Sequence, residues 1–161
     1  MIRYCFSCWA ENRYAAVVCE ACGASLDETG KTFADRLIDA IGHPEPTRAV
    51  MAAELLGRLR AAHAVEPLLV RLARKPDSMD VTAAVAAALG RIGAARAALG
   101  LAAVLLDGER PLPARLATAE ALAAIGDPAA CAALADALAL PRLPRLLRRV
   151  IEAVLAPAGA T

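Results

Sequence analysis

The stretch Ala114–Asp127, ARLATAEALAAIGD, recurs along this chain with a period of 33 residues. In the same register stand Arg48–Ala61, RAVMAAELLGRLRA, then Val81–Ala94, VTAAVAAALGRIGA, and finally Leu147–Ala160, LRRVIEAVLAPAGA. A fixed period of about 20–50 residues is typical of stacked supersecondary units. The aligned apolar columns predicted to join neighbouring units are Leu56, Leu89, Leu122 and Leu155, then Met51, Ala84, Ala117 and Val150, and then Leu59, Ile92, Ile125 and Ala158.

Each unit is expected to be a pair of helices, because the apolar residues recur at helical spacing and alanine, the best helix former, is abundant. A lone helix capped by Thr32 precedes the first full pair, and its apolar face carries Phe33, Leu37, Ile38 and Ile41. The fold class is therefore mainly α. The expected pairs are Thr47–Leu59 with Ala64–Arg74, Met79–Ile92 with Arg96–Leu106, and Ala114–Ile125 with Pro128–Leu140, followed by an unpaired helix at Leu146–Leu155.

The phrase ARLATAEALAAIGDPAACAALADAL, which starts at Ala114, resembles the HEAT-like repeats first associated with phycobilin lyases. The resemblance implies a short α-solenoid of about 3.5 repeats over residues 31–161, whose second helices line a concave face. Such repeats occur in lyases, scaffolds, inhibitors and nucleic-acid binders, so the resemblance implies the fold rather than the function. The residues that match the repeat pattern V-R-x-x-A-A-x-A-L-G-x-I-G-D are Arg115, Ala119, Leu122, Ile125, Gly126 and Asp127.

Residues 1–30 form a different module, built around Cys5-Phe-Ser-Cys8 and Cys19-Glu-Ala-Cys22. Two such knuckles supply four thiolates for a tetrahedral Zn²⁺, although four thiolates also suit iron, and two disulfides or four free thiols are the alternatives. A closed four-cysteine site leaves no position for water or substrate, so the ion would be structural. The segment from residue 4 to residue 26 also resembles the short bacterial zinc ribbon, which implies the same four ligands.

Every Phe, Tyr and Trp of the chain lies in the first 33 positions. The second knuckle has Gly23 after its last cysteine, where a positive φ is convenient, and the first knuckle has Trp9 at the equivalent place. The indole is either a lid over the small core of the ribbon or an exposed anchor for a partner. Tyr4, Phe6 and Tyr14 have the same two interpretations, because aromatic residues dominate both small cores and binding hot spots.

The last predicted helix offers a second candidate surface. Arg145, Arg148 and Arg149 share one helical face, and no acidic residue interrupts the run from Arg142 to Arg149. Ile151 and Leu155 are expected at an apolar edge. One side of this edge packs on the preceding helix and the rest is simply exposed, or the edge is covered by the trailing PAGAT, or it contacts another chain. The residues predicted to bind a partner are Trp9, Tyr14, Arg145, Arg148, Arg149, Ile151 and Leu155.

Composition and charge argue against several classes of function. The net charge is +1 and the ribbon is not basic, which disfavours nucleic acid as the main partner. The longest uncharged apolar run in the repeats, Ala97–Leu106, is far shorter than the roughly 20 residues of a spanning helix. The charged and cysteine-bearing N-terminus does not match a signal peptide, so no membrane association and a cytoplasmic location are expected.

No catalytic grouping is found among the few candidate residues. His43 and His63 do not begin His-Glu pairs, which excludes the di-iron centre of HEAT-like hydroxylases, and Cys131 is predicted to be a small buried hydrophobe rather than a nucleophile. The repeats lack the aromatic residues that a pocket for a tetrapyrrole or a flipped base would need. The sequence thus predicts a non-catalytic protein–protein adaptor with no small-molecule substrate. The alternatives are a nucleic-acid-associated factor that uses the arginine cluster, or a lyase-like accessory of a cofactor-bearing protein.

Overall fold

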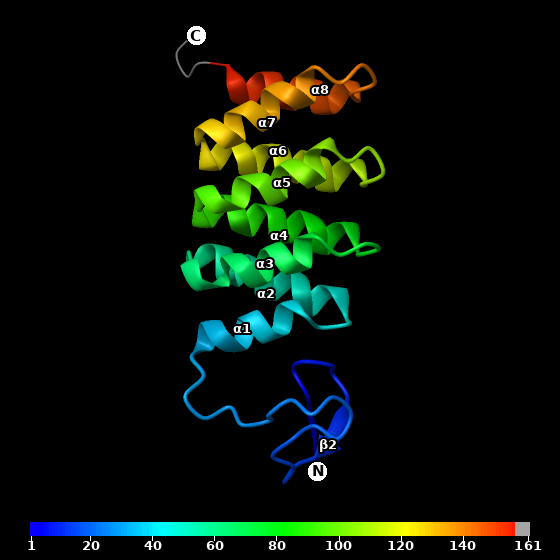
Figure 1. Cartoon of the computed structure of the whole chain (residues 1–161), viewed down its shortest axis with the longest axis vertical. Helices are drawn as coiled ribbons and strands as arrows, with labels where there is room; N and C mark the ends of the chain where they lie inside the picture. Colours follow the sequence, from blue (N-terminus) through cyan, green and yellow to red (C-terminus); the bar gives the residue numbers. More distant parts are fainter. Residues whose placement is uncertain (157–161) are drawn as a thin grey trace.

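The computed structural model describes residues 1–156, so the predicted column member Ala158 and the segment PAGAT lie outside the described residues. A small two-stranded hairpin stands at one end of a stack of helices, next to α1, and α8 stands at the other end (Figure 1). The elements in chain order are β1 Ile2–Tyr4, β2 Glu11–Arg13, α1 Phe33–Ile41, α2 Pro46–Arg58, η1 Ala62–Ala64, α3 Val65–Leu72, α4 Met79–Ile92, η2 Ala95–Ala97, α5 Ala98–Leu106, α6 Leu112–Ile125, α7 Pro128–Leu138 and α8 Arg145–Leu155.

The helices form two layers. The first helices of the repeats, α2, α4, α6 and α8, pack successively on one another, and the second helices, α1, α3, α5 and α7, form the layer beside them (Figure 1). This is the short α-solenoid that the repeat predicts, and the predicted helices are all present with ends that differ by a few residues. The main difference is that η1 and η2, two short 3₁₀ turns, open the second helices of the first two repeats.

Close contacts between first helices explain the Leu-Gly phrase that recurs in the repeat. A Cβ atom added to Gly57 would lie 2.8 Å from the Cα atom of Ala88, and one added to Gly90 would lie 2.7 Å from the Cα atom of Ala121. Both distances are shorter than real Cβ atoms show. The two glycines therefore let α2 approach α4, and α4 approach α6, almost backbone to backbone.

In only one of the three predicted columns are the first three members completely buried. Leu56, Leu89 and Leu122 have no exposed side-chain surface, as predicted for residues covered by the next repeat. Within the described residues nothing covers the fourth member, Leu155, which is 38% exposed. The other two columns lie toward the side of each first helix that faces the preceding repeat, and their first members, Met51 and Leu59, are exposed because no first helix precedes α2.

Two further expectations of burial are wrong for the same reason. Cys131 is exposed, whereas its aligned positions Val65 and Ala98 are buried, because α7 is the last second helix described and no later one covers it. Phe33 is also exposed, since it lies at the start of α1 on the open side of the stack. Of the predicted apolar face of α1, only Leu37 and Ile41 are buried.

Arginine side chains cap the second helices, which end without partners for their last carbonyl groups. Arg71 donates from Nη1 to the carbonyl oxygen of Ile41 at 2.9 Å, and its other nitrogens bind the carboxylate of Asp77. Cations at these positions also complement the negative end of the helix dipole. Three more arginines donate to carbonyl oxygens at the ends of α3, α5 and α7: Arg110 to Leu72, Arg115 to Leu105, and Arg148 to Leu138.

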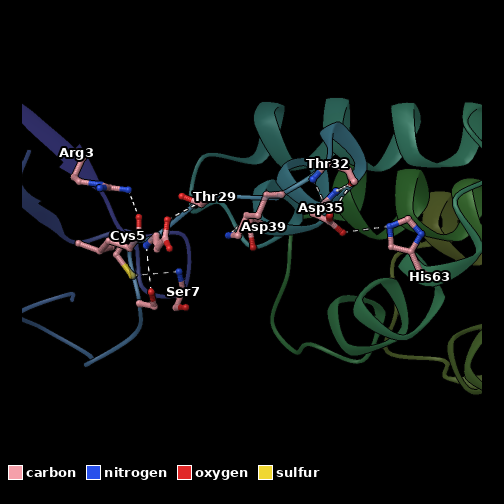
Figure 2. A network of polar contacts seen from close by, with 12 residues as sticks. Arg3, Cys5, Ser7, Thr29, Thr32, Asp35, Asp39 and His63 are labelled. Atoms are coloured by element: carbon pink, nitrogen blue, oxygen red, sulfur yellow. Dashed lines mark hydrogen bonds and ion pairs between the residues drawn. The ribbon is translucent and has the colours of Figure 1, made fainter. Parts of the chain in front are cut away.

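The first helix begins at a capping box that ties the linker to the stack. The Thr32 hydroxyl accepts from the backbone N–H of Asp35 at 3.2 Å, and the Asp35 carboxylate accepts from the backbone N–H of Thr32 at 2.9 Å (Figure 2). Asp35 also lies 3.5 Å from Nε2 of His63 in the loop after α2 (Figure 2). The hydrogen bonds from the Thr32 hydroxyl and backbone N–H, together with the charge of His63, lower the pKa of Asp35 below its ordinary 3.8.

Replacing Thr32 with alanine is expected to destabilise the solenoid by about 1 kcal/mol at neutral pH, because a helix N-cap is lost. Urea unfolding followed by circular dichroism measures the change.

The pKa of Asp35 is lower in the folded state than in the unfolded state. The contribution of Asp35 to stability is therefore complete above pH 3.8 and disappears as the pH falls through the folded-state pKa. The difference between the wild type and Thr32→Ala should therefore shrink at pH 3. Ser78→Ala is the control, because Ser78 is the N-cap residue of α4 and its side chain makes no capping hydrogen bond. An equal loss in both variants would contradict this account.

Candidate metal centre

The four predicted ligand cysteines come together in the ribbon. The Sγ atoms of Cys5, Cys8, Cys19 and Cys22 all lie within 4.8 Å of one another. The separation is 3.6 Å between Cys5 and Cys22 and 3.7 Å between Cys8 and Cys19. Thiolates at the corners of a tetrahedron with metal–sulfur bonds of about 2.3 Å are about 3.8 Å apart. The cluster therefore fits one tetrahedrally coordinated ion.

The backbone and one amide of the ribbon orient these sulfur atoms. The backbone N–H of Ser7 donates to Sγ of Cys5 at 3.4 Å (Figure 2), and Nδ2 of Asn12 donates to Sγ of Cys19 at 3.6 Å. Asn12 is buried and also accepts from the backbone N–H of Glu20, so one side chain joins the β-hairpin to the second knuckle. Sequence reasoning missed this role of Asn12, although Asn12 lies within the segment that resembles the bacterial zinc ribbon.

The local environment gives two thiols of the cluster, those of Cys19 and Cys22, very different pKa values. Burial disfavours the Cys19 thiolate, but hydrogen bonds from the backbone of Cys22 and from Asn12 outweigh it and lower the pKa of Cys19 to about 6. The N–H of Ala24 favours the Cys22 thiolate, yet the Cys8 thiol and burial raise the pKa of Cys22 to about 12. A bound cation would displace the remaining protons from the cluster. The affinity of the cluster for the cation should therefore decrease as the pH is lowered.

The ribbon is fastened to the solenoid through the residue that follows its first knuckle. Trp9 adopts φ 60°, the left-handed conformation that Gly23 adopts in the second knuckle. Its ring lies edge-on to Phe6 at 5.3 Å and 4.2 Å from the ring of His43, in the loop between α1 and α2. Trp9 is thus half-buried at the joint between the two parts of the chain, and is neither a lid over the ribbon core nor a free anchor.

Replacing His43 with alanine is expected to loosen this joint, because one of the two rings that pack against Trp9 is lost. Such aromatic pairs contribute roughly 0.5–1.5 kcal/mol. Trp9 is the only tryptophan of the chain, so its fluorescence reports the joint directly, and a shift to longer wavelength is expected while the helical circular dichroism stays unchanged. His63→Ala is the control at a distant loop. An unchanged spectrum in His43→Ala would show that the contact contributes nothing in solution.

The helical part of this fold matches a known family of repeats. Residues 34–116, just over half of the chain, match the family described as HEAT repeats. The chain belongs to the HEAT-repeat family. No curated protein matches the chain significantly. The matched HEAT repeats run from α1 into α6 and exclude the cysteine cluster. Among the described helices, none has the length and apolar character needed to cross a membrane.

The predicted partner residues at the end of the HEAT repeats have different environments. Ile151 is completely buried between α8 and its neighbours, so it is removed from the candidate surface. Arg148 is half-buried and donates to the carbonyl oxygen of Leu138 at 3.2 Å, which gives it a structural role. Arg145 and Arg149 are exposed, and Leu155 is 38% exposed. Tyr14 in the ribbon is 63% exposed, so it stays a surface candidate at the other end of the molecule.

Proposed function

We propose that this protein is a non-catalytic adaptor in which a structural zinc ribbon, residues 1–30, is joined to a HEAT-repeat solenoid, residues 31–161, that binds another protein. The observation that carries the proposal is the closed set of four cysteine sulfur atoms next to a joint made by Trp9 and His43. All four corners of the tetrahedron are protein ligands, which supports a structural rather than a catalytic ion. HEAT repeats present extended surfaces preformed for protein binding, which supports the adaptor role.

We propose zinc as the ion because a closed tetrahedral set of four thiolates is one of the ligand sets of structural zinc sites. When bound, the ion would hold the two knuckles together, and its binding free energy would be folding free energy for a segment with a very small core. That core contains Leu26 and the buried Cys5 and Cys19. A cytoplasmic location, where thiols stay reduced, fits this use of cysteine.

The adaptor proposal is tested by affinity purification of the tagged full-length protein from its own cells at moderate and at high salt. A stoichiometric protein that remains bound at high salt supports the proposal. Nucleic acid that elutes as salt rises, with no protein partner, would contradict it and favour a role for the exposed Arg142, Arg145 and Arg149. A bound chromophore would instead favour the lyase-like accessory.

A further inference from the structure

The four cysteines of the ribbon are not equally shielded from solvent. Cys5 and Cys19 are buried, whereas Cys8 and Cys22 are exposed. Each knuckle thus contributes one shielded and one accessible cysteine to the cluster. A small dissolved oxidant can therefore reach one side of the cluster while the ribbon stays folded.

Each accessible cysteine contacts the shielded cysteine of the other knuckle. Sγ of Cys8 lies 3.7 Å from Sγ of Cys19, and Sγ of Cys22 lies 3.6 Å from Sγ of Cys5. A solvent-accessible cysteine beside a second cysteine is typical of thiols that respond to oxidants, because the second sulfur converts the sulfenic acid of the first into a disulfide. The cluster contains this arrangement twice.

Hydrogen bonds keep the two shielded sulfur atoms beside their neighbours. The backbone N–H of Ser7 donates to Sγ of Cys5 at 3.4 Å, and Nδ2 of Asn12 donates to Sγ of Cys19 at 3.6 Å. The Asn12 side chain is itself held by the backbone N–H of Glu20. The sulfur atom needed for the second step of disulfide formation is thus already in position in both pairs.

We propose that the cluster is a site of oxidative modification, at which hydrogen peroxide links Cys8 to Cys19 and Cys22 to Cys5 and so ends metal binding. The inference rests on the proposed four-cysteine zinc site and adds a reaction to it. Cys131, the cysteine outside the cluster, is exposed on α7 and has no second cysteine beside it in the described chain, so it is expected to form no disulfide within the chain.

The reaction balances in atoms and electrons. The Cys8 thiolate attacks one oxygen of hydrogen peroxide, so that an S–O bond forms, the O–O bond breaks and hydroxide leaves. The Cys19 thiolate then attacks the oxidised sulfur, so that the S–S bond forms, the S–O bond breaks and a second hydroxide leaves. Cys22 and Cys5 consume a second peroxide in the same way. Four thiolates and two peroxide molecules give two disulfides and four hydroxide ions, and four electrons pass from sulfur to oxygen.

Oxidation would cost the ribbon the ion that holds it together. Thiolates are the metal ligands, and the sulfur atoms of a disulfide carry no charge to bind a cation. The ribbon core contains little besides Leu26 and the two shielded cysteines, so the segment would lose most of the folding free energy that the ion supplies. A dithiol reductant together with Zn²⁺ would restore the site, because disulfides are reversible products.

The test adds hydrogen peroxide to the zinc-loaded full-length protein and follows released zinc with a chromogenic chelator. Remaining thiols are then blocked with N-ethylmaleimide, and a tryptic digest is analysed by tandem mass spectrometry. Trypsin cleaves after Arg13, between the knuckles, so a disulfide between knuckles joins two peptides that a disulfide within a knuckle leaves separate. We expect complete loss of zinc, joined peptides with the links Cys8–Cys19 and Cys5–Cys22, and full recovery of zinc after dithiothreitol and Zn²⁺ are added.

The matched control is Cys131→Ser, which should release zinc to the same extent as the wild type. Retention of zinc in this variant would overturn the proposal, because the oxidation would then pass through Cys131. So would retention of zinc in the wild type, disulfides within the knuckles, or sulfinic acids in place of disulfides. Zinc that resists peroxide would leave the proposed function intact, whereas a protein that cannot be loaded with zinc would overturn both.

Discussion

Replacing Cys19 with serine is expected to abolish stoichiometric metal binding and to unfold the ribbon, while the helices of the solenoid remain. Cys19 is 2% exposed. Its Sγ accepts a hydrogen bond from the side-chain amide of Asn12 and lies 3.7 Å from Sγ of Cys8. Loss of a residue that only supports a ligand costs about 10–100-fold in metal affinity, so loss of a ligand should cost roughly 100-fold or more. Metal analysis of the purified protein, far-ultraviolet circular dichroism and Trp9 fluorescence measure the three effects.

The control for this experiment is Cys131→Ser, since Cys131 is the one cysteine outside the cluster and is exposed on α7. It should leave the metal content, helicity and fluorescence unchanged. A Cys19→Ser protein that retains a full equivalent of metal would contradict the assignment of the ligands. A loss of helicity equivalent to several repeats would show that the solenoid depends on the ion for folding.

Replacing Gly90 with leucine is expected to destabilise the solenoid by about 3 kcal/mol, near the upper part of the range for overpacking a close contact. Even a Cβ atom at this position would lie 2.7 Å from the Cα atom of Ala121, a backbone atom that cannot rotate away. Leucine is the better helix former by nearly 1 kcal/mol, so a loss of stability would show that the contact between α4 and α6 dominates over helix propensity. Urea denaturation followed by circular dichroism gives the free energy of unfolding.

Gly108→Leu is the matched substitution at an open position. A Cβ atom there meets nothing within 4 Å, and the residue lies in the exposed turn between α5 and α6. Its effect should stay within about 0.5 kcal/mol, as for most surface substitutions. If Gly90→Leu were as stable as Gly108→Leu, the first helices would not approach as closely as described.

The helical repeat could be predicted almost completely from the sequence, because a period of 33 residues repeats both the apolar columns and the turns. Helix α4 has the predicted bounds Met79–Ile92. What the pattern cannot supply is which side of a helix has a neighbour. Leu56 and Met51 are both apolar members of aligned columns, yet the first is buried by α4 and the second faces the open end of the stack.

The cysteine cluster was also predictable, since the knuckle spacing alone places the four ligands. The joint between the ribbon and the solenoid was not, because the contact of Trp9 with His43 joins residues that share no motif and are far apart in the chain. The environment of Ile151 was missed for a related reason. Its apolar character fits both an exposed edge and a buried contact, and only the packing of α8 on its neighbours decides between them.

The central claim is that a closed, structural four-thiolate zinc site holds the two knuckles of the ribbon together. X-ray absorption at the metal edge of the purified full-length protein tests it most directly. The account predicts one zinc ion per chain with four sulfur neighbours at about 2.3 Å and no lighter ligand. A coordination shell with nitrogen or oxygen in place of a sulfur, or iron in place of zinc, would contradict it.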